Sequence, residues 1–340
     1  MTEEKSAKRR IDRIREGGGM LMVGDESDGA VVSAEGIGHR LFAIKEEAIY
    51  VIALADQIDP GRTREDIPNT VQKIADVGAK SEVVQKTLLT GLELFKKERL
   101  IDSVSHESAL LSVIDIMNDL VAADSVAGEI KRVLLHNRET TIQPKQGALA
   151  LPSYPRLHAE TKTFIQKMDH AMQGVFDLCC IFYSEETLRK SGKWFDGLHN
   201  HLVKTLPEDD EFIGFVEGLA HFGKLVRNVR HCIEHPKRDR QIIVNDYRLT
   251  ANKELLEPEI GVLHEATPLD IVRADEFFRF FIESALVWCE TLMAFLAGRH
   301  MAELGGFEIV VDEIPEAQRH YAGVRFGYLV NVGGNFSRLG

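Results

Sequence analysis

The stretch FGKLVRNVRHCIEHP at residues 222–236 decides how the rest of the chain is interpreted. Placed on a helix at about 100° per residue, its apolar residues share one broad arc, which is typical of a helix packed in a core. The opposite arc carries mainly cationic and imidazole side chains, namely Lys224, Arg227, Arg230, His231 and His235. Proline follows His235, and a residue before proline is disfavoured in the α region. We therefore expect an amphipathic helix that ends at a polar cluster.

Apolar residues recur at three- and four-residue spacing on both sides of this stretch, which predicts further long helices. We expect one helix across residues 164–182, a second after Ser184, the quoted helix after Pro207, and a fourth at 274–298. The short connections favour antiparallel neighbours. Residues 241–249 and 260–264 suggest a β-hairpin projecting from the bundle, and residues 307–314 and 324–332 alternate like strands.

The first half of the chain is also predicted to be mainly helical. This prediction rests on apolar runs, which lie at residues 41–57, 66–76, 81–97, 105–120 and 125–136. Residues 1–40 are expected to form an arm with a small hairpin, and the proline-rich segment 143–156 a linker between a helical region (41–142) and a bundle (157–303). Residues 304–340 would hold the last strands. The expected fold class is mainly α, an up-and-down four-helix bundle with a β-hairpin insertion and short C-terminal strands, preceded by an N-terminal helical region.

Composition bounds the classes of function. The chain has 340 residues, 44% of them hydrophobic, and a net charge of −12, so it does not resemble a protein that coats nucleic acid nonspecifically. Residues 224–240 nevertheless hold six Lys and Arg residues against two acids. The four cysteines show no CxxC or Cys/His ligand spacing, so we expect neither a zinc site nor a disulfide framework. No GxxxxGK(S/T) motif and no GxGxxG motif opening a helix after a strand is present, and we expect no cofactor. No uncharged apolar run reaches 18 residues, so we expect a cytoplasmic protein without a membrane span.

Arg230, His231 and His235 together resemble the signature of the HEPN superfamily, an Arg followed by a polar residue and ending in His after four to six intervening positions. The resemblance covers about residues 155–303. It implies a metal-independent endoribonuclease that leaves a 2′,3′-cyclic phosphate and a 5′-hydroxyl. It also implies a homodimer paired through the motif helix, and a role as a toxin or phage-defence effector with an antitoxin or regulatory protein as partner.

The resemblance also implies roles for single residues. His235 would be the general acid or base, Arg230 would hold the scissile phosphate, and His231 would assist. The cations expected to contact RNA phosphates are Arg227, Lys224, Lys237 and Arg238. Apart from the resemblance, Asn228 and Glu234 could either fix the histidine tautomers or simply cap the helix and face solvent.

Helix geometry keeps other interpretations open. Arg230 and His235 lie about 140° and about 7.5 Å apart on an ideal helix, so they cannot face one atom unless the helix end is irregular or two protomers pair. Arg227 and His231, in contrast, are neighbours one turn apart. A non-catalytic scaffold that binds RNA, a nucleotide or a protein partner is the alternative function, and a purely structural helical module is a third.

Overall fold

The computed structural model describes residues 8–17, 19–139, 144–145, 147–303, 305–333 and 335–339. The chain forms two compact units, Met1–Val84 and Gln85–Gly340. It contains 50% helix and 20% strand, so the predicted mainly α class is wrong and the fold is mixed α/β.

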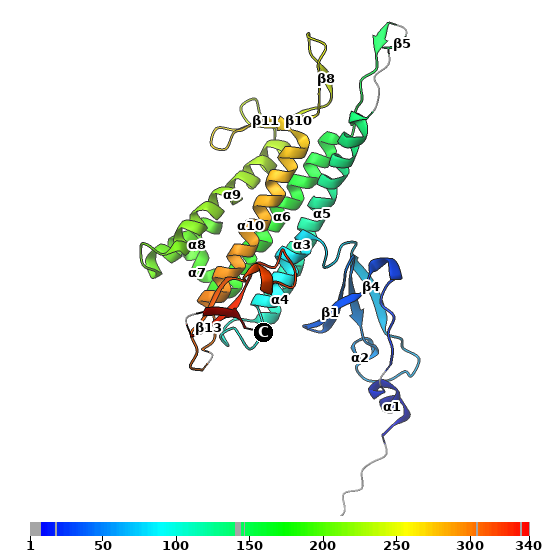
Figure 1. The fold of residues 1–340 in the computed structure, drawn as a ribbon, viewed down its shortest axis with the longest axis vertical. Coiled ribbons are helices and arrows are strands. Elements are labelled where there is room, and N and C mark those ends of the chain that lie inside the picture. The colour runs from blue at the N-terminus through cyan, green and yellow to red at the C-terminus, as the bar shows by residue number, and fades with distance from the viewer. Residues whose placement is uncertain are drawn as a thin grey trace, which may run out of the picture. The chain divides into compact units, whose positions relative to one another are not determined.

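The N-terminal unit is built on a four-stranded antiparallel sheet (Figure 1). Its strands follow chain order: β1 (Val31–Ile37), β2 (Arg40–Lys45), β3 (Ile49–Ala53) and β4 (Thr70–Ala75). Two short helices, α1 (Arg10–Glu16) and α2 (Ala55–Ile58), complete it. Three of its residues, Ala43, Tyr50 and Ile52, pack together in the core. The predicted helices at residues 41–57 and 66–76 are therefore wrong. The small hairpin expected within residues 1–40 is replaced by the pairing of β1 with β2, which extends to Lys45.

A tight turn explains why the apolar run at residues 41–57 is two strands. The backbone N–H of Lys45 donates to the carbonyl of Ala48 at 2.8 Å, which reverses the chain between β2 and β3. Gly78 then passes so close that a Cβ there would lie 2.1 Å from the carbonyl oxygen of Lys45. Each strand is a short apolar run, and such runs cannot be told from a buried helix by periodicity.

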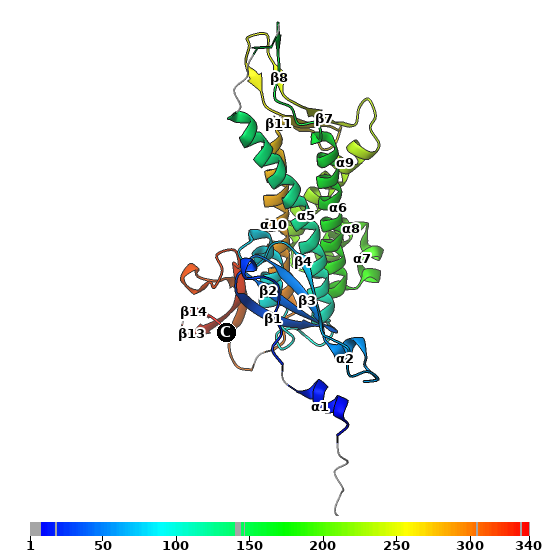
Figure 2. The same cartoon turned by 90° about the vertical axis from the view of Figure 1, so that its right-hand side faces the viewer.

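The second unit is organised around four long helices that run side by side in both views (Figures 1 and 2). They are α5 (His106–Arg138), α6 (Leu157–Tyr183), α9 (Glu211–Glu234) and α10 (Ala274–Arg299). The pair α7 (Glu185–Ser191) and α8 (Trp194–Thr205) packs against α9. The sequence had placed α5, as two helices, outside the bundle. Instead α5 is one helix lying along α6.

A second correction concerns the N-terminal edge of this unit. The sequence predicted one helix at residues 81–97, and the structure has three short helical turns there instead. They are α3 (Glu82–Val84), a π-helical turn at Gln85–Leu89 and α4 (Thr90–Leu94). The predicted linker lies within the second unit, where β5 (Pro144–Lys145) and β6 (Ala148–Leu149) form a small hairpin and Tyr154 is buried. Residues 140–143 and 146 of this region lie outside the described residues.

Small antiparallel sheets occupy the ends of the helices. β7 (Gln241–Asn245) pairs with β10 (Glu259–Leu263), the two strands expected from the sequence, and β11 (Leu269–Arg273) adds a third. Beyond β7 a two-stranded ribbon holds β8 (Arg248–Leu249) and β9 (Leu255–Leu256). A C-terminal sheet has the order β12 (Ile309–Glu313), β13 (Phe326–Val332), β14 (Asn335–Arg338).

Helix α10 is apolar because it is the central helix of this unit. By length and composition this helix could cross a membrane, but 61% of its most apolar 18-residue segment is buried inside the protein. Buried aromatic side chains dominate it, among them Phe277, Phe278 and Phe281. A core helix gives the same signal, so this feature is weak evidence for a membrane either way.

Candidate functional site

The sequence-predicted site lies at the C-terminal end of α9. The helix begins after Asp210, whose carboxylate accepts from the backbone N–H of Phe212 at 3.0 Å. It ends at Glu234, and His235 leaves helical geometry with φ −134° and ψ 61° while its N–H still bonds the carbonyl of His231 at 2.9 Å. Pro236 accounts for this break, because the residue before proline avoids the α region. Because His235 is not helical, its position relative to His231 differs from the one expected on an ideal helix.

His231 and His235 form a pair on the protein surface. Their ring centroids lie 6.4 Å apart and both side chains are exposed. Partial burial and the cations Arg240 and Arg227 lower the pKa of His231 below its usual range, while Asp169 opposes this shift. His231 is therefore biased toward the neutral imidazole, the form that can accept a proton.

Arg230 does not share their surroundings. Its Nη1 donates to Asp169, and its Nε donates to Glu234 at 3.1 Å. Gln166 donates to the other oxygen of Glu234 at 2.9 Å, and Gln173 donates to Asp169. Arg230 is thus held between two carboxylates at the α6–α9 contact, and the pKa of Glu234 is lowered by its hydrogen bonds to Gln166 and Arg230.

Arg227 takes a different partner. Its guanidinium lies 4.8 Å from the centre of the Trp194 ring, and among the described residues no carboxylate comes within ion-pair distance of it. Lys224, one turn earlier, is paired with Asp196 at 2.7 Å. Of the predicted phosphate ligands on α9, only Arg227 therefore carries a charge that is not compensated.

The remaining predicted residues lie around the end of the helix. Asn228 donates to the hydroxyl of Thr267 at 3.2 Å, which ties α9 to the loop before β11. Lys237 and Arg238 are exposed in a turn closed by the hydrogen bonds between Lys237 and Arg240. The structure brings His231, His235, Arg227 and Arg240 into one electrostatic neighbourhood, and it draws Arg230 and Glu234 toward α6.

Sequence reasoning missed Asp169, Trp194 and Arg240. Asp169 has a side chain only 1% exposed, and it follows Ile165 by one turn on the apolar face of α6. A carboxylate in a buried arc was the available signal, since such a group needs a cationic partner. Trp194 and Arg240 carried no comparable signal, because they meet α9 only through the tertiary fold.

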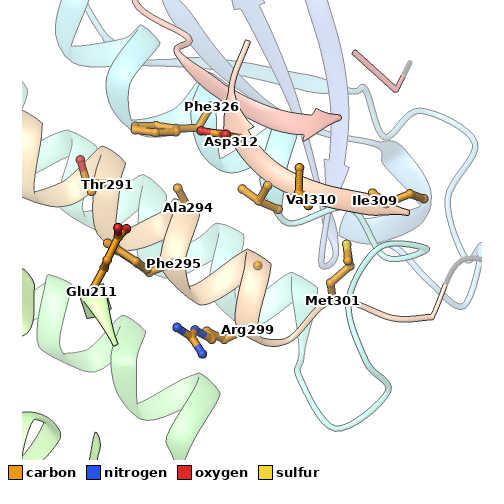
Figure 3. Close-up of a pocket in the computed structure, with 12 residues that line it drawn as sticks. Glu211, Thr291, Ala294, Phe295, Arg299, Met301, Ile309, Val310, Asp312 and Phe326 are labelled. Carbon is orange, nitrogen blue, oxygen red and sulfur yellow. The ribbon is translucent and has the colours of Figure 1, made fainter. Parts of the chain in front are cut away.

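A separate, mostly apolar pocket lies between α10 and the strands β12 and β13 (Figure 3). Its volume is about 410 Å³, and Phe295, Met301 and Ile309 are among its walls. Arg299 at its edge is already paired with Asp210. Glu211, the first residue of α9, also lines it, so about 30 Å of helix separates this pocket from His231. It contains none of the predicted site residues.

The described residues hold no cluster of three or more His, Cys, Asp or Glu side chains placed to bind a metal ion. The chemistry of the α9 end is therefore that of two imidazoles and their neighbouring cations. Comparison with known proteins leaves this geometry as the basis for a function: no family model, curated protein or solved structure matches the chain.

Proposed function

We propose that the C-terminal end of α9 binds RNA and cleaves its phosphodiester bonds without a metal ion. The observation that carries the proposal is the exposed His231–His235 pair, with ring centroids 6.4 Å apart. A proton donor or acceptor acts through hydrogen bonds of about 3 Å. Two imidazoles at this separation can therefore reach the attacking and the leaving oxygen on opposite sides of one phosphate.

The proposed reaction assigns one proton transfer to each histidine. Neutral His231 takes the proton of the ribose 2′-hydroxyl, and the 2′-oxygen attacks the phosphorus. The bond between phosphorus and the 5′-oxygen breaks as protonated His235 gives its proton to that oxygen. The products are a 2′,3′-cyclic phosphate and a 5′-hydroxyl. The lowered pKa of His231 supports its role as the base.

Arg227 and Arg240 are the proposed phosphate ligands. Both contribute to the positive field at His231, and the Nε of Arg240 is buried without a hydrogen-bond partner among the described residues. Arg230, the phosphate ligand expected from the sequence, has two nitrogens bound to carboxylates. In this proposal it positions α9 against α6.

A second subunit is not needed for the proposed reaction, because acid and base lie on one chain. The homodimer through α9, the antitoxin or regulatory partner and the role in defence stay predictions from the resemblance, and the cytoplasmic location stays a prediction from the sequence. The mass of the protein in solution tests the dimer.

The test is RNA cleavage in excess EDTA. Unstructured RNA is incubated with the wild-type protein and with His231→Gln, His235→Gln and His221→Gln. His221 is an exposed histidine on the same helix and serves as the matched control. We expect a loss of about 10²-fold or more in the first two variants, since general acid–base catalysis contributes about 10²–10⁴-fold, and no change in the control. Absence of cyclic phosphate products from the wild type overturns the proposal.

RNA binding without cleavage is the second candidate function. The observation that favours it is the engagement of Arg230 by Asp169 and Glu234, which removes the central cation of the motif from direct phosphate contact. Retention of labelled RNA by wild type in EDTA, with the RNA recovered intact, would identify this alternative.

A further inference from the structure

A second pocket opens beside the proposed site, and we name it the Trp194 pocket. It has a volume of about 520 Å³ and lies between α6, the α7–α8 connection and α9. Its walls combine flat rings, cations and two carboxyl groups, mainly Phe176, Trp194, Arg189, Lys193, Arg227, Asp177 and Glu185. This volume is within the range of small-molecule sites.

Trp194 presents a fixed aromatic surface to this pocket. Its φ of +55° lies in the left-handed region, which bulky residues rarely adopt. Gly223 on α9 allows the close approach, because a Cβ there would lie 3.4 Å from the Trp194 ring and 3.0 Å from Phe195. The half-buried indole is therefore held against α9, with the guanidinium of Arg227 stacked on it. Stacked indole and guanidinium planes are the surfaces on which nucleic-acid bases stack.

The pocket also carries uncompensated positive charge. Arg189 is paired with Glu185. Lys193 and Arg227, in contrast, have no carboxylate within ion-pair distance in the described part of the chain. Two free cations beside an aromatic surface fit a ligand that joins a planar ring to an anionic group. Asp177, which also lines the pocket, offers oxygens for the amino groups of a base.

The Trp194 pocket shares Arg227 with the proposed cleavage site. Arg227 lines the pocket and lies four residues, about 6 Å along the helix axis, before His231. Gln173 forms another part of its wall and donates to Asp169, the carboxylate that holds Arg230. A nucleotide in the pocket would therefore have its phosphate near His231.

We propose that the Trp194 pocket binds one ribonucleotide, with its base against Trp194 and its phosphate on Arg227 and Lys193. The ligand is either a nucleotide within an RNA strand or a free nucleotide. The link to cleavage rests on the proposed function, whereas nucleotide binding itself requires no reaction. The pocket would thus bind the nucleotide next to the phosphodiester bond that is cleaved, and would discriminate between bases at that position.

Tryptophan fluorescence tests this proposal directly, because the chain has two tryptophans. Trp288→Phe leaves Trp194 as the single tryptophan. This protein is titrated with adenosine 5′-monophosphate and, separately, with a 2′-O-methyl tetranucleotide that cannot be cleaved through its 2′-oxygen. Saturable quenching supports the proposal. Tighter binding of the tetranucleotide identifies an RNA strand as the source, and tighter binding of the monophosphate identifies a free nucleotide. No change with either probe overturns it.

Two variants separate binding from folding. Trp194→Leu and Arg227→Met should each weaken binding about 10-fold or more, within the range seen when a stacking contact with a base is removed. Arg227→Met does not alter the left-handed backbone at Trp194, so it keeps the test valid if Trp194→Leu fails to fold. Lys204→Met is the control. It removes an exposed cation that lies outside the pocket on α8, the helix of Trp194, and it should leave the affinity for either probe unchanged. Unaltered affinity in Arg227→Met would contradict the proposal.

The two proposals fail in different ways. Quenching of Trp194 in a protein that leaves RNA intact would remove the cleavage reaction and keep the pocket. Cleavage with an unchanged KM in Trp194→Leu, and no quenching, would remove the pocket and keep the reaction. If both hold, Trp194→Leu raises KM and leaves kcat nearly unchanged, because it acts on binding rather than on proton transfer. Arg227→Met raises KM and also lowers kcat/KM at acidic pH, because Arg227 lowers the pKa of the proposed base His231.

Discussion

Arg227 and Arg230 lie three residues apart on α9, yet their surroundings make them different kinds of residue. Arg230 is held by Asp169, a carboxylate with 1% exposure, and by Glu234. Arg227 stacks on Trp194 and has no carboxylate partner in the described part of the chain. The sequence signature singled out Arg230, whereas the geometry leaves the available charge on Arg227. Whether an arginine can bind a phosphate is decided by what already holds its guanidinium.

The largest effect that tests this comparison is on stability. Arg230→Met leaves Asp169 buried without its cation, and one oxygen of Asp169 already lacks a hydrogen-bond partner. Removing one member of a buried ion pair is strongly destabilising, so we expect the free energy of unfolding to fall by about 3 kcal/mol. Chemical denaturation followed by circular dichroism measures this change.

A double variant shows whether the loss comes from the unpaired charge. Asp169→Asn removes the carboxylate and keeps a polar group for Gln173 to bond. Added to Arg230→Met, it should restore at least half of the lost free energy, because no buried charge is left without a partner. An equal or larger loss in the double variant would show that Arg230 acts through packing alone.

The same distinction between local and distant partners explains which parts of the fold could be predicted. The spacing of apolar residues in α6, α9 and α10 is a property of each helix, and the sequence locates all three. The sheet of the N-terminal unit depends on strands finding each other, as in the pairing of Leu41 with Ile52. Its short apolar runs fit a helix or a strand equally well, and pairing decides between them.

Close packing at Trp194 gives the next largest effect. Gly223→Ala places a methyl group 3.0 Å from the Phe195 ring and 3.4 Å from the Trp194 ring, so we expect a loss of about 1–2 kcal/mol and a shift in Trp194 fluorescence. Gly214→Ala is the control on the same helix. Nothing lies within 4 Å of its added Cβ, and alanine should stabilise the helix by about 0.5–1 kcal/mol. Similar effects of both changes would argue against a tight contact between Trp194 and α9.

The candidate site shows the same limit of sequence reasoning. His231 and His235 could be located because Pro236 marks the helix end and their spacing is local. The partners that give Arg227 and Arg230 separate roles lie 33 and 61 residues away in sequence, at Trp194 and Asp169. Only the packing of α8 and α6 against α9 brings them together.

A smaller effect is expected when Arg227 is tested for stability. Arg227→Met removes a contact between an exposed cation and a ring, which is worth about 0.5–1 kcal/mol, and it leaves no buried charge behind. We therefore expect less than about 1 kcal/mol in the denaturation experiment that is used for Arg230→Met. A loss as large as that of Arg230→Met would mean that both arginines are structural, and the comparison between them would fail.

The smallest effect is a change in proton affinity. Arg227 is one of the cations that lower the pKa of His231, so Arg227→Met should raise this pKa, as measured by NMR titration of the histidine rings. At a given pH below about 6.5, the histidine reference value, more His231 would then be protonated and less could act as the base. The acidic limb of the kcat/KM profile should move to higher pH in this variant.

The lowered pKa of His231 also determines how the free energy of unfolding changes with pH. His231 has a lowered pKa in the folded state, so below about pH 6.5 the unfolded chain binds more protons and stability rises with pH through that window. Arg227→Met should make this rise shallower. Lys204→Met is the control, because Lys204 lowers the pKa of His201 and is not among the cations that act on His231. If Arg227→Met leaves the His231 titration unchanged, the charge of Arg227 does not reach the histidine pair, and the proposed phosphate contact loses its electrostatic basis.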